Sequence, residues 1–212
     1  MQLHPERLDR AWLARPAEEI ARDLLGCRLV RTLDDGTVLS GFITETEAYT
    51  GPEDRASHAY GGRRTERNGS MWAEPGTGYV YFTYGMHFCM NISCFRADHP
   101  AAVLIRAVAP ERGIETMRAL RSSKLRKHPL RDRDLSNGPA KLCQALAIDG
   151  SLDGLDLLQS PQLAICQGVA VPDDRVERTP RIGIANAGEW KDKPLRWVTG
   201  MHPDGAGCEK MQ

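Results

Sequence analysis

The segment RLVRTLDDGTVLSGFITETEA, residues 28–48, decides the fold because it predicts a β-hairpin. Residues 28–33 predict the first strand, and the long alternating run over residues 37–48 predicts the second. The tripeptide DDG at residues 34–36 supplies the residue types that tight turns prefer. A β-hairpin is therefore expected over residues 28–48.

The second strand of this hairpin carries two carboxylates two positions apart. Because side chains alternate across a strand, Glu45 and Glu47 are expected on one face together with Leu39 and Ile43. A carboxylate among apolar neighbours is a candidate for a raised pKa and for general-base chemistry. Pairing of one or both with an arginine is the competing interpretation. In glycoside hydrolases the two catalytic carboxylates lie on opposite sides of the glycosidic bond, about 5–10 Å apart. Two carboxylates on one strand point the same way, which argues against that mechanism.

The remaining elements do not alternate regularly between strands and helices. Helices are expected over residues 16–25, over residues 111–122, and from Pro139 to about Ile148 with Asn137 as the cap. Further strands are expected at residues 79–82, 88–95, 101–108, 180–185 and 195–198. This order predicts an α+β fold with an antiparallel or mixed sheet.

Composition limits the class of protein. The chain has 212 residues, 41% of them hydrophobic and 26% charged, and its 28 basic and 28 acidic residues cancel. These values exclude a disordered, collagen-like or coiled-coil chain. The length suits one domain, which we expect over residues 1–202, followed by a frayed tail over residues 203–212.

Cysteine spacing and hydropathy give expectations about metals, membranes and location. The six cysteines include no CxxC pair and no histidine pair at zinc spacing, so we expect reduced, buried thiols and no metal. The N-terminus lacks the apolar core of a signal peptide. The uncharged stretch at residues 75–95 holds glycines and polar residues, which argue against a membrane span. We expect an intracellular protein, cytoplasmic or in the nucleoid if bacterial.

Basic and aromatic residues gather although the chain as a whole is neutral. Residues 55–67 carry a net charge of +3 and residues 112–133 carry +6, which suits a polyanionic partner. A solvated loop and one charged helix are the alternative interpretation. All five tyrosines lie between Tyr49 and Tyr84. Core packing is their usual role, but stacking surface beside phosphate-binding charge is also how unpaired bases are held.

No metal, phosphate-loop or dinucleotide motif occurs in the sequence. His58 lies in a polar connection over residues 51–78, a length that usually carries function, but no cysteine or serine nucleophile accompanies it. Hydrolysis by an acid or base residue and water is therefore the simplest chemistry available.

Five segments, in their order and spacing, resemble one family of DNA repair enzymes. They are TETEAYTGPEDRASHAYGGRRTERN, YVYFTYGMHFCMNIS, LIRAVAPERGIETMR, GPAKLCQAL and PRIGIANAGEWKDKPLRW. Through them the chain is similar to the alkyladenine (3-methyladenine) DNA glycosylase family over about residues 15–200. The resemblance implies a single compact α+β domain with a curved antiparallel sheet and surrounding helices, like the C-terminal domain of methionyl-tRNA formyltransferase.

The same resemblance implies the reaction. An alkylated or deaminated purine, of the 3-methyladenine, 7-methylguanine, hypoxanthine and ethenoadenine class, would be flipped out of double-stranded DNA and released by hydrolysis of its N-glycosidic bond. No lysine is implied to attack the sugar, so a monofunctional enzyme is expected, without cofactor or metal and as a monomer. An abasic site would remain in the DNA.

Residue roles also follow from the resemblance. Glu47 would activate the water with assistance from Arg106, and Glu45 would only support them. The residues implied for the base pocket are Tyr49, His58, Tyr81, Asn91 and Leu104, with Asn91 set against the exocyclic amine of normal guanine. The residues implied for DNA contact are Tyr84, which intercalates, Met86 beside it, Arg63, Thr65, Arg121 and Lys141. One departure is His87, where vertebrate members carry a second tyrosine.

Two other functions compete with this interpretation. A non-catalytic nucleic-acid-binding module on the same fold would have no use for Glu47 and Arg106. A hydrolase of free nucleosides or glycosides, using Glu45 and Glu47, would need neither the wedge at Tyr84 nor the two basic stretches.

Overall fold

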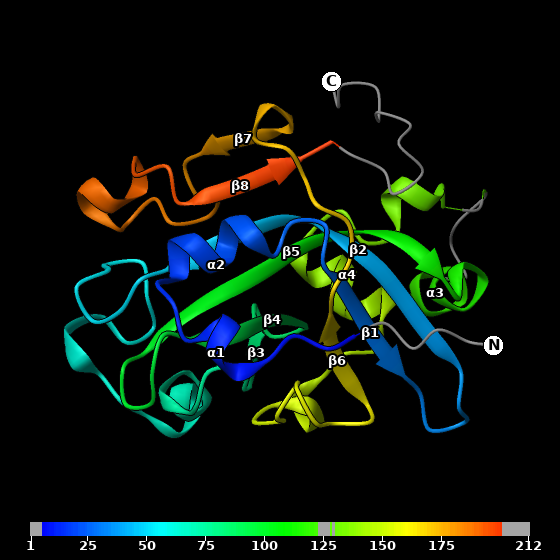
Figure 1. Cartoon of the computed structure of the whole chain (residues 1–212), viewed down its shortest axis with the longest axis horizontal. Coiled ribbons are helices and arrows are strands. Elements are labelled where there is room, and N and C mark those ends of the chain that lie inside the picture. The colour runs from blue at the N-terminus through cyan, green and yellow to red at the C-terminus, as the bar shows by residue number, and fades with distance from the viewer. Residues whose placement is uncertain (1–5, 123–127, 129, 201–212) are drawn as a thin grey trace.

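The predicted hairpin forms and lies at the centre of the sheet. The computed structural model describes residues 6–122, 128 and 130–200. Strand β1 (Arg28–Thr32) pairs antiparallel with the first half of β2 (Val38–Tyr49). The other edge of β2 pairs with β5 (Ala101–Arg112), so β2 and β5 form a long central pair (Figure 1).

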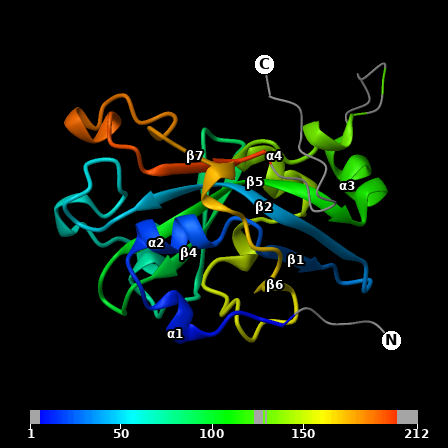
Figure 2. The same cartoon turned by 45° about the horizontal axis from the view of Figure 1, so that its top comes forward.

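The eight strands of the described chain form one open antiparallel sheet, in which the order β3-β4-β5-β2-β1-β6 is continuous. Strand β8 pairs with β2 beyond the end of β1, and β7 pairs with β8. Figures 1 and 2 show the β7–β8 hairpin and β6 on opposite sides of the molecule. The other strands are β3 (Gly78–Thr83), β4 (His87–Cys94), β6 (Leu163–Cys166), β7 (Val176–Thr179) and β8 (Arg196–Thr199). The expected single α+β domain with an antiparallel sheet is confirmed.

Short helices cover this sheet. The α-helices are α1 (Arg10–Leu13), α2 (Ala17–Asp23), α3 (Ile114–Arg121) and α4 (Pro139–Ala145). The 3₁₀ helices are η1 (Tyr60–Gly62), η2 (Glu66–Trp72), η3 (Asp132–Asp134), η4 (Gly150–Leu152), η5 (Asp173–Arg175) and η6 (Gly188–Lys191). Helix α2 lies along β2 (Figure 1), and Ile20 and Ala21 belong to the same fully buried core as Val103 and Ile105 of β5. This apolar layer supports the centre of the sheet from one side.

Bulges in the central strand pair correct one sequence prediction. Ile43 lies opposite Val108 and Glu45 lies opposite Ala107, so Thr44 is an extra residue without a partner on β5. An inserted residue reverses the faces on which the following side chains lie. The prediction that Leu39, Ile43, Glu45 and Glu47 share one face is therefore wrong: Ile43 packs in the core, whereas Glu45 and Glu47 face the other way.

Three predicted elements also differ from the structure. The strand expected at residues 180–185 is wrong, because this segment has no strand structure and the strand precedes it as β7. Gly138, not Asn137, caps α4, and the Asn137 side chain instead accepts a hydrogen bond from Lys141 Nζ. The helix expected over residues 111–122 starts only after Gly113, because β5 continues to Arg112. The short elements α1 and β6 were not predicted.

Several other expectations can be compared with the described residues. The five described cysteines are free and buried, as expected. Within the part of the chain that the structure describes, no cluster of histidine, cysteine or acidic side chains could hold a metal ion. Over those same residues, no helix is both long and apolar enough to cross a membrane. The expected tail at 203–212 and part of the basic stretch at 112–133 lie outside the described residues.

Candidate active site

One cavity of about 230 Å³ opens on the face of the sheet opposite α2. Seven of the residues singled out from the sequence line it, namely Tyr49, His58, Tyr81, Tyr84, Asn91, Leu104 and Arg106. The other lining residues are Ala56, Met71, Tyr79, Thr83, Cys89, Pro139, Ile182, Gly183 and Ile184. Residues from four strands, two helices and three connections thus meet at one place.

Strand register explains how the cavity floor is built. Leu104 of β5 lies opposite Asn91 of β4 on one side and opposite Glu47 of β2 on the other. Residues directly opposite each other in a sheet point to the same face. Asn91, Leu104 and Glu47 therefore form one row across three strands, and all three are nearly or fully buried.

Aromatic rings form one wall of the cavity. The rings of His58 and Tyr81 meet edge to face with centroids 4.6 Å apart, and those of Tyr79 and Tyr81 are 5.2 Å apart. His58 Nδ1 and the Tyr79 hydroxyl share a hydrogen bond of 2.8 Å. Burial, reinforced by the nearby charge of Arg67, lowers the pKa of His58, so its imidazole is neutral at pH 7. The wall is consequently an uncharged aromatic surface.

The Asn91 side chain closes the floor beside this wall. Its amide nitrogen Nδ2 donates to the backbone carbonyl of Tyr79 at 3.0 Å, across the β3–β4 pair. This hydrogen bond fixes which way the amide points. The floor of the cavity thus offers a rigid amide beside the aromatic wall.

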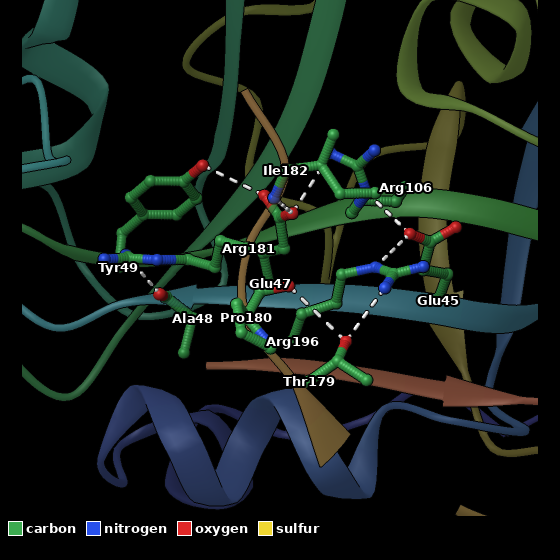
Figure 3. A network of polar contacts seen from close by, with 10 residues as sticks. All are labelled: Glu45, Glu47, Ala48, Tyr49, Arg106, Thr179, Pro180, Arg181, Ile182 and Arg196. Atoms are coloured by element: carbon green, nitrogen blue, oxygen red, sulfur yellow. Dashed lines mark hydrogen bonds and ion pairs between the residues drawn. The ribbon is translucent and has the colours of Figure 1, made fainter. Parts of the chain in front are cut away.

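The Glu47 carboxylate is fully buried, and Figure 3 shows its polar contacts. Its Oε1 accepts a hydrogen bond of 2.8 Å from the backbone N–H of Ile182 and lies 3.2 Å from Arg106 Nη1. Its Oε2 accepts a hydrogen bond of 3.0 Å from the Tyr49 hydroxyl. Since Tyr49, Arg106 and Ile182 all line the cavity, the carboxylate contacts the cavity through these three residues.

Burial raises the pKa of Glu47, and the surrounding groups oppose this shift. The guanidinium of Arg106, the N–H of Ile182 and the hydroxyl of Tyr49 all favour the charged carboxylate, while Glu45 disfavours it. A carboxylate with a raised pKa is a stronger base once it is ionised. Burial and the polar partners of Glu47 therefore act on its pKa in opposite directions.

The second carboxylate has a different environment. Glu45 Oε1 accepts hydrogen bonds from Arg106 Nε at 2.7 Å and from Arg196 Nε at 2.6 Å. Arg196 also donates through Nη1 to the Thr179 hydroxyl at 2.8 Å (Figure 3). Arg106 is thus shared between both carboxylates, and the predicted alternative of pairing with arginine is confirmed alongside the buried carboxylate.

The tip of the β3–β4 hairpin projects beside the cavity. Its residues Tyr84 and Met86 are 83% and 69% exposed, although large apolar side chains are usually buried. Tyr84 adopts φ = 51°, a left-handed conformation that is uncommon for a bulky residue and is often found at functional sites. His87 pairs with Thr83 at the base of this tip.

Comparison with known proteins identifies the family. The family model described as "Methylpurine-DNA glycosylase (MPG)" matches residues 11–203. The chain belongs to the methylpurine-DNA glycosylase family.

The relatives agree with this assignment. The chain is 50% identical over 205 residues to a "DNA-3-methyladenine glycosylase" of Homo sapiens, covering 94% of this chain and 68% of the human protein. It is 51% identical to the Mus musculus protein of the same name, of which it covers 61%. A "Putative 3-methyladenine DNA glycosylase" of Streptomyces avermitilis is 45% identical over 87% of this chain and 85% of its own length. The expectation of a monofunctional DNA-3-methyladenine glycosylase that serves DNA repair is confirmed.

The predicted DNA-contacting residues of this glycosylase, other than Tyr84, lie outside the cavity wall. Thr65 caps η2, where its N–H donates to Asn68 Oδ1 at 2.7 Å. Arg121 of α3 donates to Gln144 of α4 and so joins the two helices. Met86, Arg63, Thr65 and Lys141 are exposed.

Sequence reasoning missed part of the site of this glycosylase. Ile182 supplies a backbone N–H, which no residue type would reveal. Asp54 and Arg181 form a buried ion pair between two connections, and only their inclusion in resembling segments marked them. Tyr79 orients His58, and the clustering of tyrosines was the one available signal.

Proposed function

We propose that this glycosylase rotates an alkylated or deaminated purine out of duplex DNA into the cavity and hydrolyses its N-glycosidic bond with a water activated by Glu47. The observation that carries this proposal is the fully buried Glu47 carboxylate, held by Tyr49, Arg106 and Ile182 directly behind an aromatic cavity. An enzyme that acts on a base must first take that base out of the stack, at a cost of a few kcal/mol.

The cavity supports a role in holding a flipped purine. Tyr49 at the end of β2 lines the cavity together with the His58–Tyr81 ring pair, and a flat base would stack between Tyr49 and this pair. Asn91 and Leu104 form the floor in the same row as Glu47. A fixed Asn91 amide would exclude a purine with a bulky exocyclic amine at this position, which is discrimination by steric clash and unpaired polar groups.

Glu47 would carry the chemical step. The ionised carboxylate takes a proton from water while the water oxygen attacks C1′ of the sugar, and the electrons of the N-glycosidic bond leave with the purine. A negative charge beside C1′ also stabilises an oxocarbenium-like transition state. Arg106, held between Glu45 and Glu47, would keep Glu47 ionised and orient the water.

Leaving groups differ in what they require. Cationic bases such as 7-methylguanine leave without a proton, whereas neutral bases such as hypoxanthine need one. The lowered pKa of His58 argues against this residue as the donor. We therefore expect excision of 7-methylguanine to need the Glu47 carboxylate but no acid in the cavity that donates a proton to the base.

Tyr84 and Met86 would insert into the gap that the flipped nucleotide leaves. Exposed apolar side chains at a tight hairpin tip suit insertion between base steps. The exposed basic residues Arg63 and Lys141, with Arg121 and Thr65, would contact phosphates as a monomer binds the duplex.

Single-turnover release of base tests this proposal. Wild-type protein and Glu47→Gln are incubated with duplexes that contain 7-methylguanine, hypoxanthine or ethenoadenine. Because the amide cannot take a proton from water, we expect excision to fall by roughly 10²–10⁴-fold while binding of the duplex is kept. Full activity of Glu47→Gln would overturn the catalytic assignment. Absence of excision by either protein, with salt-sensitive DNA binding, would favour the binding-module interpretation.

A second variant separates flipping from chemistry. Tyr84→Ala removes the wedge but no contact of Glu47, so we expect slower excision from a normal duplex, by roughly tenfold. The loss should shrink when the lesion is opposite an abasic position, where flipping costs less. An equal loss on both duplexes would count against the wedge.

A further inference from the structure

One wall of the cavity is made by a segment without regular structure. Ile182, Gly183 and Ile184 line the cavity, yet Gly183 has φ = +80° and Ile182 is 52% exposed. Exposed irregular segments are usually the least stable parts of a fold. The Ile182 N–H nevertheless has to stay 2.8 Å from Glu47 Oε1.

The residue next to Ile182 is anchored by a fully buried ion pair. The Arg181 and Asp54 side chains are both 0% exposed, and Arg181 donates to Asp54 through Nη1 at 2.5 Å and through Nη2 at 2.8 Å. Arg181 Nη1 also donates to the backbone carbonyl of Ala48, the residue between Glu47 and Tyr49, at 2.8 Å (Figure 3). The guanidinium thus joins the irregular segment directly to β2.

The other end of the pair holds the opposite connection. Asp54 accepts hydrogen bonds from the backbone N–H groups of Thr50 at 3.2 Å and Ala56 at 3.0 Å. Ala56 lines the cavity, and His58 follows it two residues later. One ion pair therefore connects both irregular walls of the cavity.

Arg181 also contacts the ring of Tyr49. Its guanidinium carbon lies 4.7 Å from the ring centroid, within the range of a cation–π interaction. The Tyr49 hydroxyl in turn donates to Glu47 Oε2. Two of the three groups that contact Glu47 are consequently held by Arg181.

A contribution to the free energy of unfolding does not explain why Asp54 and Arg181 are buried as an ion pair. Two charges taken out of water cost more solvation than a salt bridge usually returns, and apolar replacements of a buried pair are often tolerated. Because this pair joins two walls of the cavity, it instead holds those walls in a fixed relative position.

We infer that Asp54 and Arg181 are positioning residues, which hold the Ile182 amide and the Tyr49 hydroxyl against Glu47. This inference rests on the proposed role of Glu47. Both of these hydrogen bonds favour the ionised carboxylate. Loss of the pair would weaken them, so the pKa of Glu47 would rise further and less of the base would be ionised at pH 7.

Other charged groups around Glu47 are expected to stay in place. The titratable and charged side chains that face it or its partners are Glu45, Tyr49, Asp54, Cys89, Arg106, Arg181 and Arg196. Of these, only Asp54 and Arg181 connect to the irregular segment. A change in the pH profile after their replacement is therefore attributed to the amide and hydroxyl that they hold.

The experiment measures single-turnover excision of 7-methylguanine from a duplex between pH 5 and 9. The variants are Arg181→Lys, which keeps the charge but not the fork of donors, and the double variant Asp54→Leu with Arg181→Met, which leaves no unpaired buried charge. Arg31→Met is the matched control. Arg31 is also buried and donates to the backbone carbonyls of Thr32, Ala147 and Gln162, outside the cavity.

We expect both test variants to lower the maximal rate at pH 7 by about 10–100-fold. The protein concentration that gives half of the maximal rate should change little. The acid limb of the pH–rate profile, where the rate falls as the pH is lowered, should move to higher pH, so the rate should partly recover at pH 9. Arg31→Met should lower the melting temperature but leave the acid limb in place. Folded variants with an unchanged acid limb would overturn the inference, as would an equal shift in Arg31→Met. If wild-type protein excised no base, the proposed function itself would fail instead.

Discussion

The two faces of the β2–β5 strand pair have opposite chemistry. On the face toward α2, Ala48, Val103 and Ile105 are fully buried in the main core, and Thr46 donates its hydroxyl to the Ala21 carbonyl of that helix at 2.6 Å. On the other face, Glu47 is buried among charged and phenolic groups. Residues that are adjacent in sequence on these strands therefore point to opposite sides, one into the apolar core and the next into the charged site.

The difference shows how one strand can serve stability and chemistry together. Because side chains alternate, each face can be optimised without changing the other. The apolar face gains free energy from burial, whereas the charged face loses solvation and recovers it only through matched partners. Substitutions on the two faces should consequently separate stability from activity.

Ile105→Ala should give the largest effect on stability. Removal of this fully buried side chain leaves a cavity against the core, and we expect the free energy of unfolding to fall by about 2–5 kcal/mol. The excision rate per folded molecule should remain within about twofold, as measured by denaturant unfolding and single-turnover assays. Leu104→Ala, one residue away on the cavity face, is the control that should slow excision. A slow but stable Ile105→Ala would contradict the separation of the faces.

Arg106→Gln should have an intermediate effect, on activity and its pH dependence. Arg106 favours the ionised form of Glu47, so its loss raises the pKa of Glu47 further. Since the base must be ionised, the acid limb of 7-methylguanine excision should move to higher pH. The rate at pH 7 should fall by at least about tenfold.

The control for this prediction is Arg196→Gln. Arg196 pairs with Glu47 through the backbones of β2 and β8, but its side chain donates to Glu45 and Thr179 and is not among the groups that shift the pKa of Glu47. The acid limb of the pH–rate profile of Arg196→Gln should therefore move less than that of Arg106→Gln. An equal shift in both variants would show that the charge around Glu45, and not the contact with Glu47, sets the pH profile.

Glu47→Gln should give the smallest effect on stability. The pKa of Glu47 in the folded protein lies above its ordinary value of 4.5, so the carboxyl contributes stability that is fully present below that value. This contribution is lost as the pH rises through the folded pKa, whereas the amide does not titrate. Wild type should therefore lose stability relative to the variant as the pH is raised from about 4.5 to about 9. Melting temperatures across this range check the sign, and a growing advantage of wild type would refute it.

Local patterns predicted much of the fold. The alternation over residues 37–48 with its DDG turn predicted the central hairpin, and the strands near residues 79–82, 88–95 and 101–108 are present. The strand at 180–185 was wrong because Ile182 and Ile184 alternate with small or polar residues, as in a strand, while their actual role is to line a cavity. The bulge at Thr44 was also missed, because the residues that enter the core after it, Thr46 and Ala48, are polar or small and do not show the change of face.

The sequence by itself determined the central hairpin, the pair of carboxylates and the aromatic and basic clusters, since these depend on residues close together in the chain. Only the tertiary structure decided what surrounds Glu47. The contact with the Ile182 amide spans 135 residues, and the Asp54–Arg181 pair spans 127. Such contacts exist only after distant segments pack together, and burial then sets the pKa of the carboxylate. The physical reason is that the solvation and the neighbours of a charge belong to the folded molecule, not to the residue that carries it.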